Sequence, residues 1–143
     1  MAVQNVVSAT LAEDTKREIL EGIAAIKGKL DFLLTLRSAE VQALFKAGKE
    51  FAPFLDECHE VARQHPAIMP GIFDKDEFER DWKLAKDLGA ISDALNQLSQ
   101  GVDHTLTAAR SDALMAALDI YAAVKLNRDR VPGLSLVAER LGS

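Results

Sequence analysis

The sequence predicts an all-α protein, an antiparallel four-helix bundle with short accessory helices. Apolar residues recur every three or four positions along each long segment, and none of these segments alternates with the period of a strand. The 143 residues are 48% hydrophobic but only 6% aromatic, so the core has to be built from Leu, Ile, Val and Ala. The stretch from Asp74 to Ala109 reads as one long amphipathic helix, whose apolar stripe needs partner helices to cover it.

The first two predicted helices are bounded by capping signals. Thr10 and Glu13 have the spacing of a capping box, in which each side chain satisfies a free backbone N–H group at the start of a helix. The four-three-four-three spacing of isoleucines and leucines that follows predicts a helix over residues 11–36. Ser38 as N-cap and Gly48 beyond the end predict a short accessory helix over residues 39–47.

The next two predicted helices are separated by a loop with two prolines. Pro53 fits only the first turn of a helix over residues 50–64, and Pro66 stops that helix. Asp74 and Glu77 then form the capping box of the long helix.

The end of the long helix is predicted from its length. A helix continuing from residue 75 to residue 128 would measure about 80 Å, which is too long for a compact domain of this size. We therefore expect a turn near Arg110 and a new helix over residues 112–128, capped by Ser111. A turn at Pro132 then precedes a short closing helix over residues 134–141. Residues 1–9 carry few structural signals and are expected to be flexible, and residues 10–143 are expected to form one domain.

The composition argues against several functional classes. The net charge is −5, and acidic and basic residues alternate along the helices, so no basic surface for nucleic acid accumulates. No segment has the pattern of a secretory signal or the length of a membrane span. The single cysteine, Cys58, fits a reducing compartment. The sequence predicts a cytoplasmic protein that binds neither nucleic acid nor membrane.

Asp56, Cys58 and His59 form the richest group of potential metal ligands. Asp56 and His59 lie three positions apart, and both could reach one ion from one helix face. A di-metal bundle needs two Glu-x-x-His pairs with two further glutamates, and zinc sites usually need four ligands in close pairs. The simpler interpretation is that Cys58 packs in the core while His59 faces solvent. The sequence therefore predicts no cofactor and no catalytic residue.

Two parts of the long helix are candidates for protein interaction. Trp82 lies near aromatic residues and methionine, which either cap one end of the bundle or form an exposed docking patch. Gln97 and Gln100 belong to a polar flank of this helix that is nearly free of charge. A surface with so little charge favours a helix–helix contact between chains. We expect weak self-association or a protein partner on one face of this helix.

The chain resembles small bacterial all-helical proteins that have no established activity. The resemblance covers about residues 10 to 141 and rests on the segments FDKDEFERD, DHTL, AALDIYAAVK and VPG. It implies a helical bundle, and no functional residue is carried over from it. The leading hypothesis is a non-enzymatic interaction or scaffold module. The alternative is a helical bundle that binds a small ligand or a metal.

Overall fold

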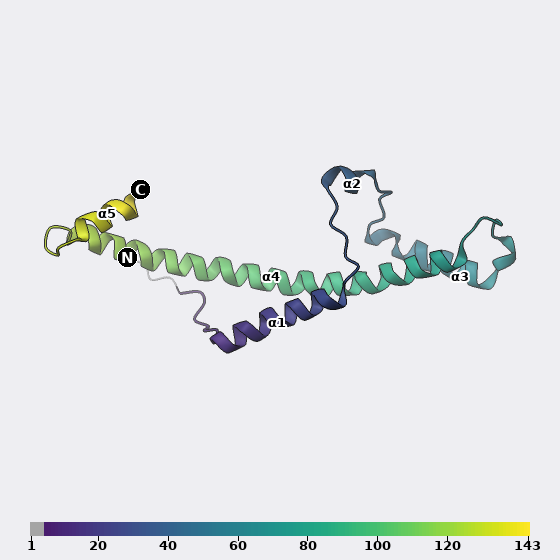
Figure 1. The fold of residues 1–143 in the computed structure, drawn as a ribbon, viewed down its shortest axis with the longest axis horizontal. Helices are drawn as coiled ribbons and strands as arrows, with labels where there is room; N and C mark the ends of the chain where they lie inside the picture. The colour runs from purple at the N-terminus through teal and green to yellow at the C-terminus, as the bar shows by residue number, and fades with distance from the viewer. Residues whose placement is uncertain (1–4) are drawn as a thin grey trace. The chain divides into compact units, whose positions relative to one another are not determined.

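The computed structural model describes residues 5–143, and every regular element in that range is helical (Figure 1). The all-α prediction is confirmed. Residues 1–4 of the predicted flexible segment lie outside the described residues, and residues 5–9 form no helix. The elements are α1 (Glu13–Lys29), α2 (Ser38–Ala43), η1 (Lys49–Phe51), α3 (Ala52–Gln64), η2 (Pro66–Ile68), α4 (Lys75–Leu126) and α5 (Leu134–Gly142), of which η1 and η2 are single 3₁₀ turns.

Helix α4 is continuous over 52 residues, so the turn predicted near Arg110 is wrong and Ser111 caps no new helix. The predicted helices 74–109 and 112–128 are one element, and a bundle of four main helices within the chain is not confirmed. One physical reason favours continuity: this part of the chain is rich in alanine and has no proline. The hydroxyls of Thr105 and Thr107 donate to the carbonyls four residues earlier, at 2.7 and 2.9 Å, a bond that slightly destabilises a helix but does not end this one.

The predicted bounds of the first two helices are also corrected. α1 ends at Lys29, well before residue 36, because Gly28 weakens its last turn. It begins at Glu13, so Thr10 does not cap it. α2 begins at Ser38 itself and ends at Ala43, where the following residue takes an extended conformation.

The chain forms two compact units, and α4 contributes to both. The first unit comprises residues 13–96. Its best-defined contact is an antiparallel pairing of α3 with the start of α4. In each pair of contacting side chains, one residue precedes Pro70 by about as many positions as the other follows it.

The second unit combines residues 97–143 with the N-terminal segment. The backbone N–H groups of Val6 and Val7 both donate to Oδ2 of Asp112, at 2.8 and 2.9 Å. At the other end of the unit, Gly133 has a φ of 88°, a conformation that favours glycine, and starts the return of α5. A Cβ atom on Gly142 would lie 2.9 Å from the hydroxyl of Tyr121, so the end of α5 closely approaches α4.

The buried hydrophobic residues of the described chain are two alanines, Ala62 in α3 and Ala138 in α5. Leu95 and Leu98 lie on the apolar stripe for which the sequence predicts covering helices, but they are 44% and 66% exposed. The reason is that no neighbouring helix in their own units covers them. Among residues 5–143, no helix combines the length and the apolar character that crossing a membrane requires.

The N-cap of α4 gives a direct stability prediction. The N–H of Glu77 donates to Oδ1 of Asp74 at 3.0 Å, as expected from the sequence. We expect Asp74→Ala to lower the free energy of unfolding by about 1 kcal/mol, the usual cost of losing a cap. Urea denaturation followed by circular dichroism measures the change. Asp74→Asn keeps the accepting oxygen and should cost much less, and equal losses for the two variants would contradict the capping role.

Candidate functional site

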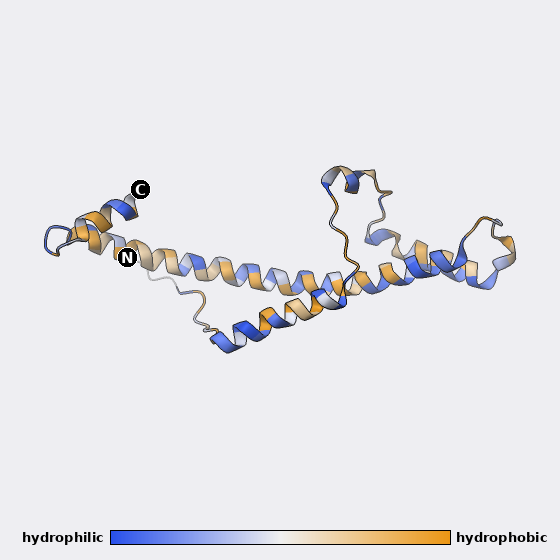
Figure 2. Ribbon diagram, in the orientation of Figure 1, coloured by the Kyte–Doolittle hydropathy of each residue, from blue (hydrophilic) through white to orange (hydrophobic). Residues whose placement is uncertain are grey.

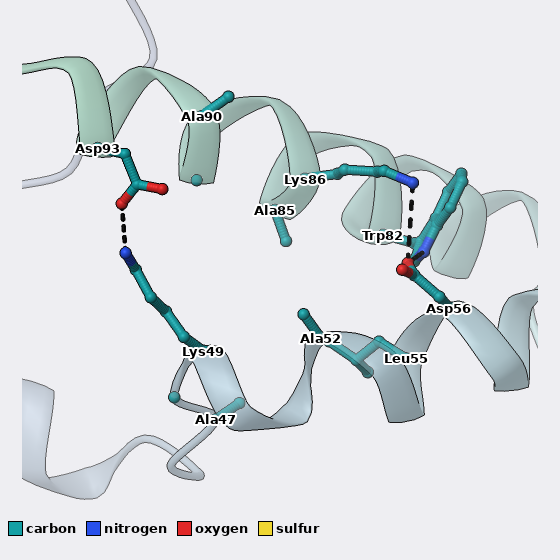
Figure 3. Close-up of a pocket in the computed structure, with 12 residues that line it drawn as sticks. Ala47, Lys49, Ala52, Leu55, Asp56, Trp82, Ala85, Lys86, Ala90 and Asp93 are labelled. Carbon is teal, nitrogen blue, oxygen red and sulfur yellow. Dashed lines mark hydrogen bonds and ion pairs between the residues drawn. The ribbon is translucent and has the colours of Figure 1, made fainter.

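The contact between α3 and α4 is centred on Trp82. Its indole ring stacks on the imidazole of His59, with ring centroids 3.6 Å apart and ring planes 8° from parallel. Trp82 Nε1 donates to Oδ1 of Asp56 at 2.9 Å. Lys86 lies above the indole ring, with Nζ 4.9 Å from the ring centroid and 3.9 Å from Oδ1 of Asp56 (Figure 3). Stacking, hydrogen bonding and charge therefore hold these two helices together at one place.

His59 is largely enclosed in this contact, with 14% of its side chain exposed. Its Nε2 atom pairs with the carboxylate of Glu79, and its ring lies 6.4 Å from that of Phe78. The imidazole is thus oriented by a carboxylate, as in many acid–base sites, but Cys58 lies on another side of α3. A nucleophile beside the imidazole, which covalent catalysis requires, is not provided by Cys58.

A cavity of about 630 Å³ lies between α3 and α4 beside the Trp82 contact. Its walls are mostly small and apolar, and the ion pair between Lys49 and Asp93 crosses it at the end away from Trp82 (Figure 3). The lining residues are Ala47, Gly48, Lys49, Ala52, Leu55, Asp56, Trp82, Ala85, Lys86, Gly89, Ala90 and Asp93. Its volume falls within the usual range for small-molecule sites, about 300–1,000 Å³.

Cys58 lines a second, smaller cavity of about 300 Å³. The walls of this cavity are almost entirely apolar, and Phe73 and Phe78 meet there with ring centroids 5.8 Å apart. The lining residues are Phe54, Glu57, Cys58, Val61, Ala62, Met69, Phe73 and Phe78. The aromatic and methionine residues near the start of α4 therefore gather here, whereas Trp82 packs against His59 instead.

The three candidate metal ligands are divided between these two environments. Asp56 and His59 turn toward α4, where Trp82 and Glu79 engage them, and Cys58 turns toward the smaller cavity. Within residues 5–143, no group of three or more His, Cys, Asp or Glu side chains is placed to hold a metal ion.

Electrostatic shifts on α3 stay local to its exposed surface. A hydrogen bond from Arg63 lowers the pKa of Glu60 from its ordinary value, and the attraction between the two charges adds to this effect. The same bond raises the pKa of Arg63. Both effects belong to a solvated pair one helical turn apart, so they indicate helix stabilisation rather than a reactive group.

The second candidate feature is an exposed apolar stripe in the part of α4 that belongs to the second unit. Figure 2 shows apolar residues recurring along this helix. Val102 and Leu106 are 56% and 42% exposed, and Leu98 precedes them by one turn. At about 100° per residue, the stripe spans an arc of roughly 100°. We call its part from residue 98 to residue 117 the α4 face, whose members are Leu98, Val102, Leu106, Ala109, Ala113 and Ala117, and the exposed Ile120 continues the same arc beyond it.

The predicted interaction residues Gln97 and Gln100 are both exposed on α4. Two residues along a helix correspond to a rotation of about 200°, so Gln100 projects nearly opposite to Val102. The uncharged flank and the α4 face are therefore separate surfaces, and each can be altered without the other.

Sequence reasoning missed the partners that hold α3 against α4. The candidate residues predicted from the sequence did not include Lys49, Glu79, Lys86 or Asp93. The sequence does contain a signal for these partners, because α3 and the start of α4 lie on either side of one loop. An antiparallel pairing of the two helices centred on Pro70 places Asp56 near Trp82 and Lys86, and Lys49 near Asp93.

Known proteins give no further guide to these features. Comparison with protein-family models, curated proteins and solved structures finds no match to this chain.

Proposed function

We propose that this protein is a non-enzymatic cytoplasmic interaction module whose α4 face binds a helix of another polypeptide. The observation that carries the proposal is the exposure of this face: Leu98, Val102 and Leu106 are all open to solvent in their own unit. Soluble proteins rarely leave a contiguous apolar surface uncovered unless it binds something. The net charge of −5 and the single cysteine support a cytoplasmic setting.

Binding at the α4 face has a clear source of free energy. Each exposed leucine or valine that leaves water contributes about 1.5–3 kcal/mol when fully buried. A partner helix packed on this stripe also supplies the neighbour that the predicted four-helix bundle requires. We infer that the antiparallel bundle predicted from the sequence forms between polypeptides rather than within one chain.

A charge placed on the α4 face tests the proposal. We expect Val102→Glu to reduce association by at least tenfold, because a carboxylate is costly to bury in a dry helix interface. Gln100→Glu is the matched control, since it adds the same charge at an exposed position nearly opposite on the helix. Sedimentation velocity over a range of concentrations measures the assembly of wild type and both variants.

The outcomes separate the two surfaces of α4. Loss of assembly in Val102→Glu alone supports the α4 face. Loss of assembly in Gln100→Glu alone indicates that the interface is the uncharged flank that contains Gln97 and Gln100. A wild-type protein that stays monomeric and binds no partner, with a cysteine at position 102 protected from alkylation, means that the same chain covers this face and the proposal is wrong.

The cavity beside Trp82 favours a second candidate function, binding of a small ligand. Its charged residues already pair with one another, so the open wall offers mainly alanine and indole surface to a neutral or apolar molecule. Native mass spectrometry of protein purified without a tag would detect a retained ligand. Ala85→Phe narrows the cavity and should release it, whereas an unchanged, ligand-free mass in both proteins contradicts this function.

A further inference from the structure

The α4 face has an uneven distribution of side-chain sizes along its length. Its first half carries the large residues Leu98, Val102 and Leu106. Its second half carries the alanines at positions 109, 113 and 117, and the next residue on the same arc, Ile120, is 63% exposed. The spacing along the face is four, four, three, four and four residues, which reads the same in both directions. A helix with this pattern is therefore complementary in shape to a reversed copy of itself.

We propose that the partner of the α4 face is the α4 face of a second copy of this chain, packed antiparallel about a two-fold axis near residues 107 and 108. This inference rests on the proposed function and names its partner. In this register Leu98 packs against Ala117 of the second copy, Val102 against its Ala113, and Leu106 against its Ala109. Each large side chain then fills the space left by a small one.

A parallel pair is disfavoured by the same pattern. Equivalent positions meet in a parallel pair, so leucine would face leucine at one end and alanine would face alanine at the other. Distances between helix axes vary over about 8–10 Å with the size of the contacting side chains. One separation cannot suit both halves of the α4 face in a parallel pair, whereas the antiparallel pair needs a single separation from residue 98 to residue 117.

The charges beside the α4 face favour the same arrangement. Asp103 and Arg110 lie on the same edge of the stripe, each about 80° from its centre at about 100° per residue. In an antiparallel helix pair, the same edge of each helix faces its counterpart. Asp103 of each copy therefore approaches Arg110 of the other, which gives two opposite-charge pairs related by the two-fold axis. Within residues 5–143, neither side chain takes part in an ion pair.

The rest of the second unit leaves this edge and the stripe open. The N-terminal segment contacts α4 at Asp112, which lies on the opposite edge of the α4 face. The end of α5 approaches Tyr121, beyond the last residue of the face. Shape and charge thus point to one occupant, a C2-related copy with the self-complementary surface that such symmetry requires.

Cysteine cross-linking distinguishes the two orientations. In a Cys58→Ser background, the double variant Val102→Cys, Ala113→Cys should form a covalent dimer in glutathione buffer, because positions 102 and 113 face each other. Val102→Cys alone should remain uncross-linked. In the antiparallel pair its two copies are about 16 Å apart along the helix axis, and a disulfide needs Cα atoms within about 7 Å.

Charge reversal provides a second, independent measurement. Asp103→Arg or Arg110→Asp alone should weaken self-association about tenfold, because two attractions become two repulsions. The double exchange Asp103→Arg, Arg110→Asp should restore it, as should mixing the two single variants. Circular dichroism verifies that each variant keeps its helix content.

The contradicting results are distinct from those for the proposed function. Cross-linking of Val102→Cys with itself, or no cross-linking of the double variant in an assembled protein, overturns the antiparallel dimer. Either result leaves binding through the α4 face intact if Val102→Glu still abolishes assembly. A wild-type protein that is monomeric at every concentration overturns the dimer, and the labelling of position 102 then decides the proposed function.

Discussion

Replacing Ala62 with aspartate is expected to lower the free energy of unfolding by about 3 kcal/mol, the lower end of the cost of an uncompensated buried charge. Ala62 is 6% exposed and lines the apolar cavity with Phe73 and Phe78. A carboxylate at this position loses hydration without gaining a cation. We therefore expect α3 to separate from the aromatic residues at the start of α4. Urea denaturation followed by circular dichroism measures the loss.

Ala94→Asp is the matched control for this change. It introduces the same residue into a helix of the same unit at an exposed position, so it includes the low helix propensity of aspartate, about 0.5 kcal/mol, without the burial. If the two variants lose equal stability, the contact around Ala62 does not hold α3 in place.

Replacing Trp82 with alanine is expected to lower the free energy of unfolding by about 2–3 kcal/mol. Truncation of a fully buried tryptophan lowers it by about 3–5 kcal/mol, and Trp82 is only half-buried. The change removes the stack on His59, the hydrogen bond to Asp56 and the ring beneath Lys86 together. Thermal unfolding monitored by far-ultraviolet circular dichroism at 222 nm measures this loss of stability.

Trp82→Phe separates the ring from its hydrogen bond. Phenylalanine keeps an aromatic surface against His59 but has no donor for Asp56, so the loss should be about 1 kcal/mol. An alanine variant as stable as the phenylalanine variant would mean that the indole stack contributes nothing to the pairing of α3 with α4.

Local signals predicted several elements well, because they depend on neighbouring residues only. Asp74 caps α4, Pro53 lies in the first turn of α3, and the closing helix starts at Leu134. The continuity of α4 was mispredicted for a different reason. The proposed break at Arg110 came from an assumed compact domain, whereas the residues there favour helix.

The candidate site could be predicted only in part. The sequence identified Asp56, His59 and Trp82 as notable residues but assigned them to separate roles. Their contact depends on the register in which α3 folds back onto α4, and one residue of shift would turn each side chain by about 100°. Periodicity predicts which residues share a helix face, but it does not predict which face meets another helix.

The length of α4 has a consequence for how this protein folds. Helices that lack tertiary packing are marginally stable in water, since most of their stability in proteins comes from packing on an apolar face. The stretch around Val102 and Leu106 lacks such packing in its own unit. Under the proposed self-association, the helical order of this stretch and its occupancy by the second copy are linked equilibria, governed by mass action. Dilution would thus loosen the backbone of this stretch, and amide hydrogens there would exchange faster as the protein concentration falls.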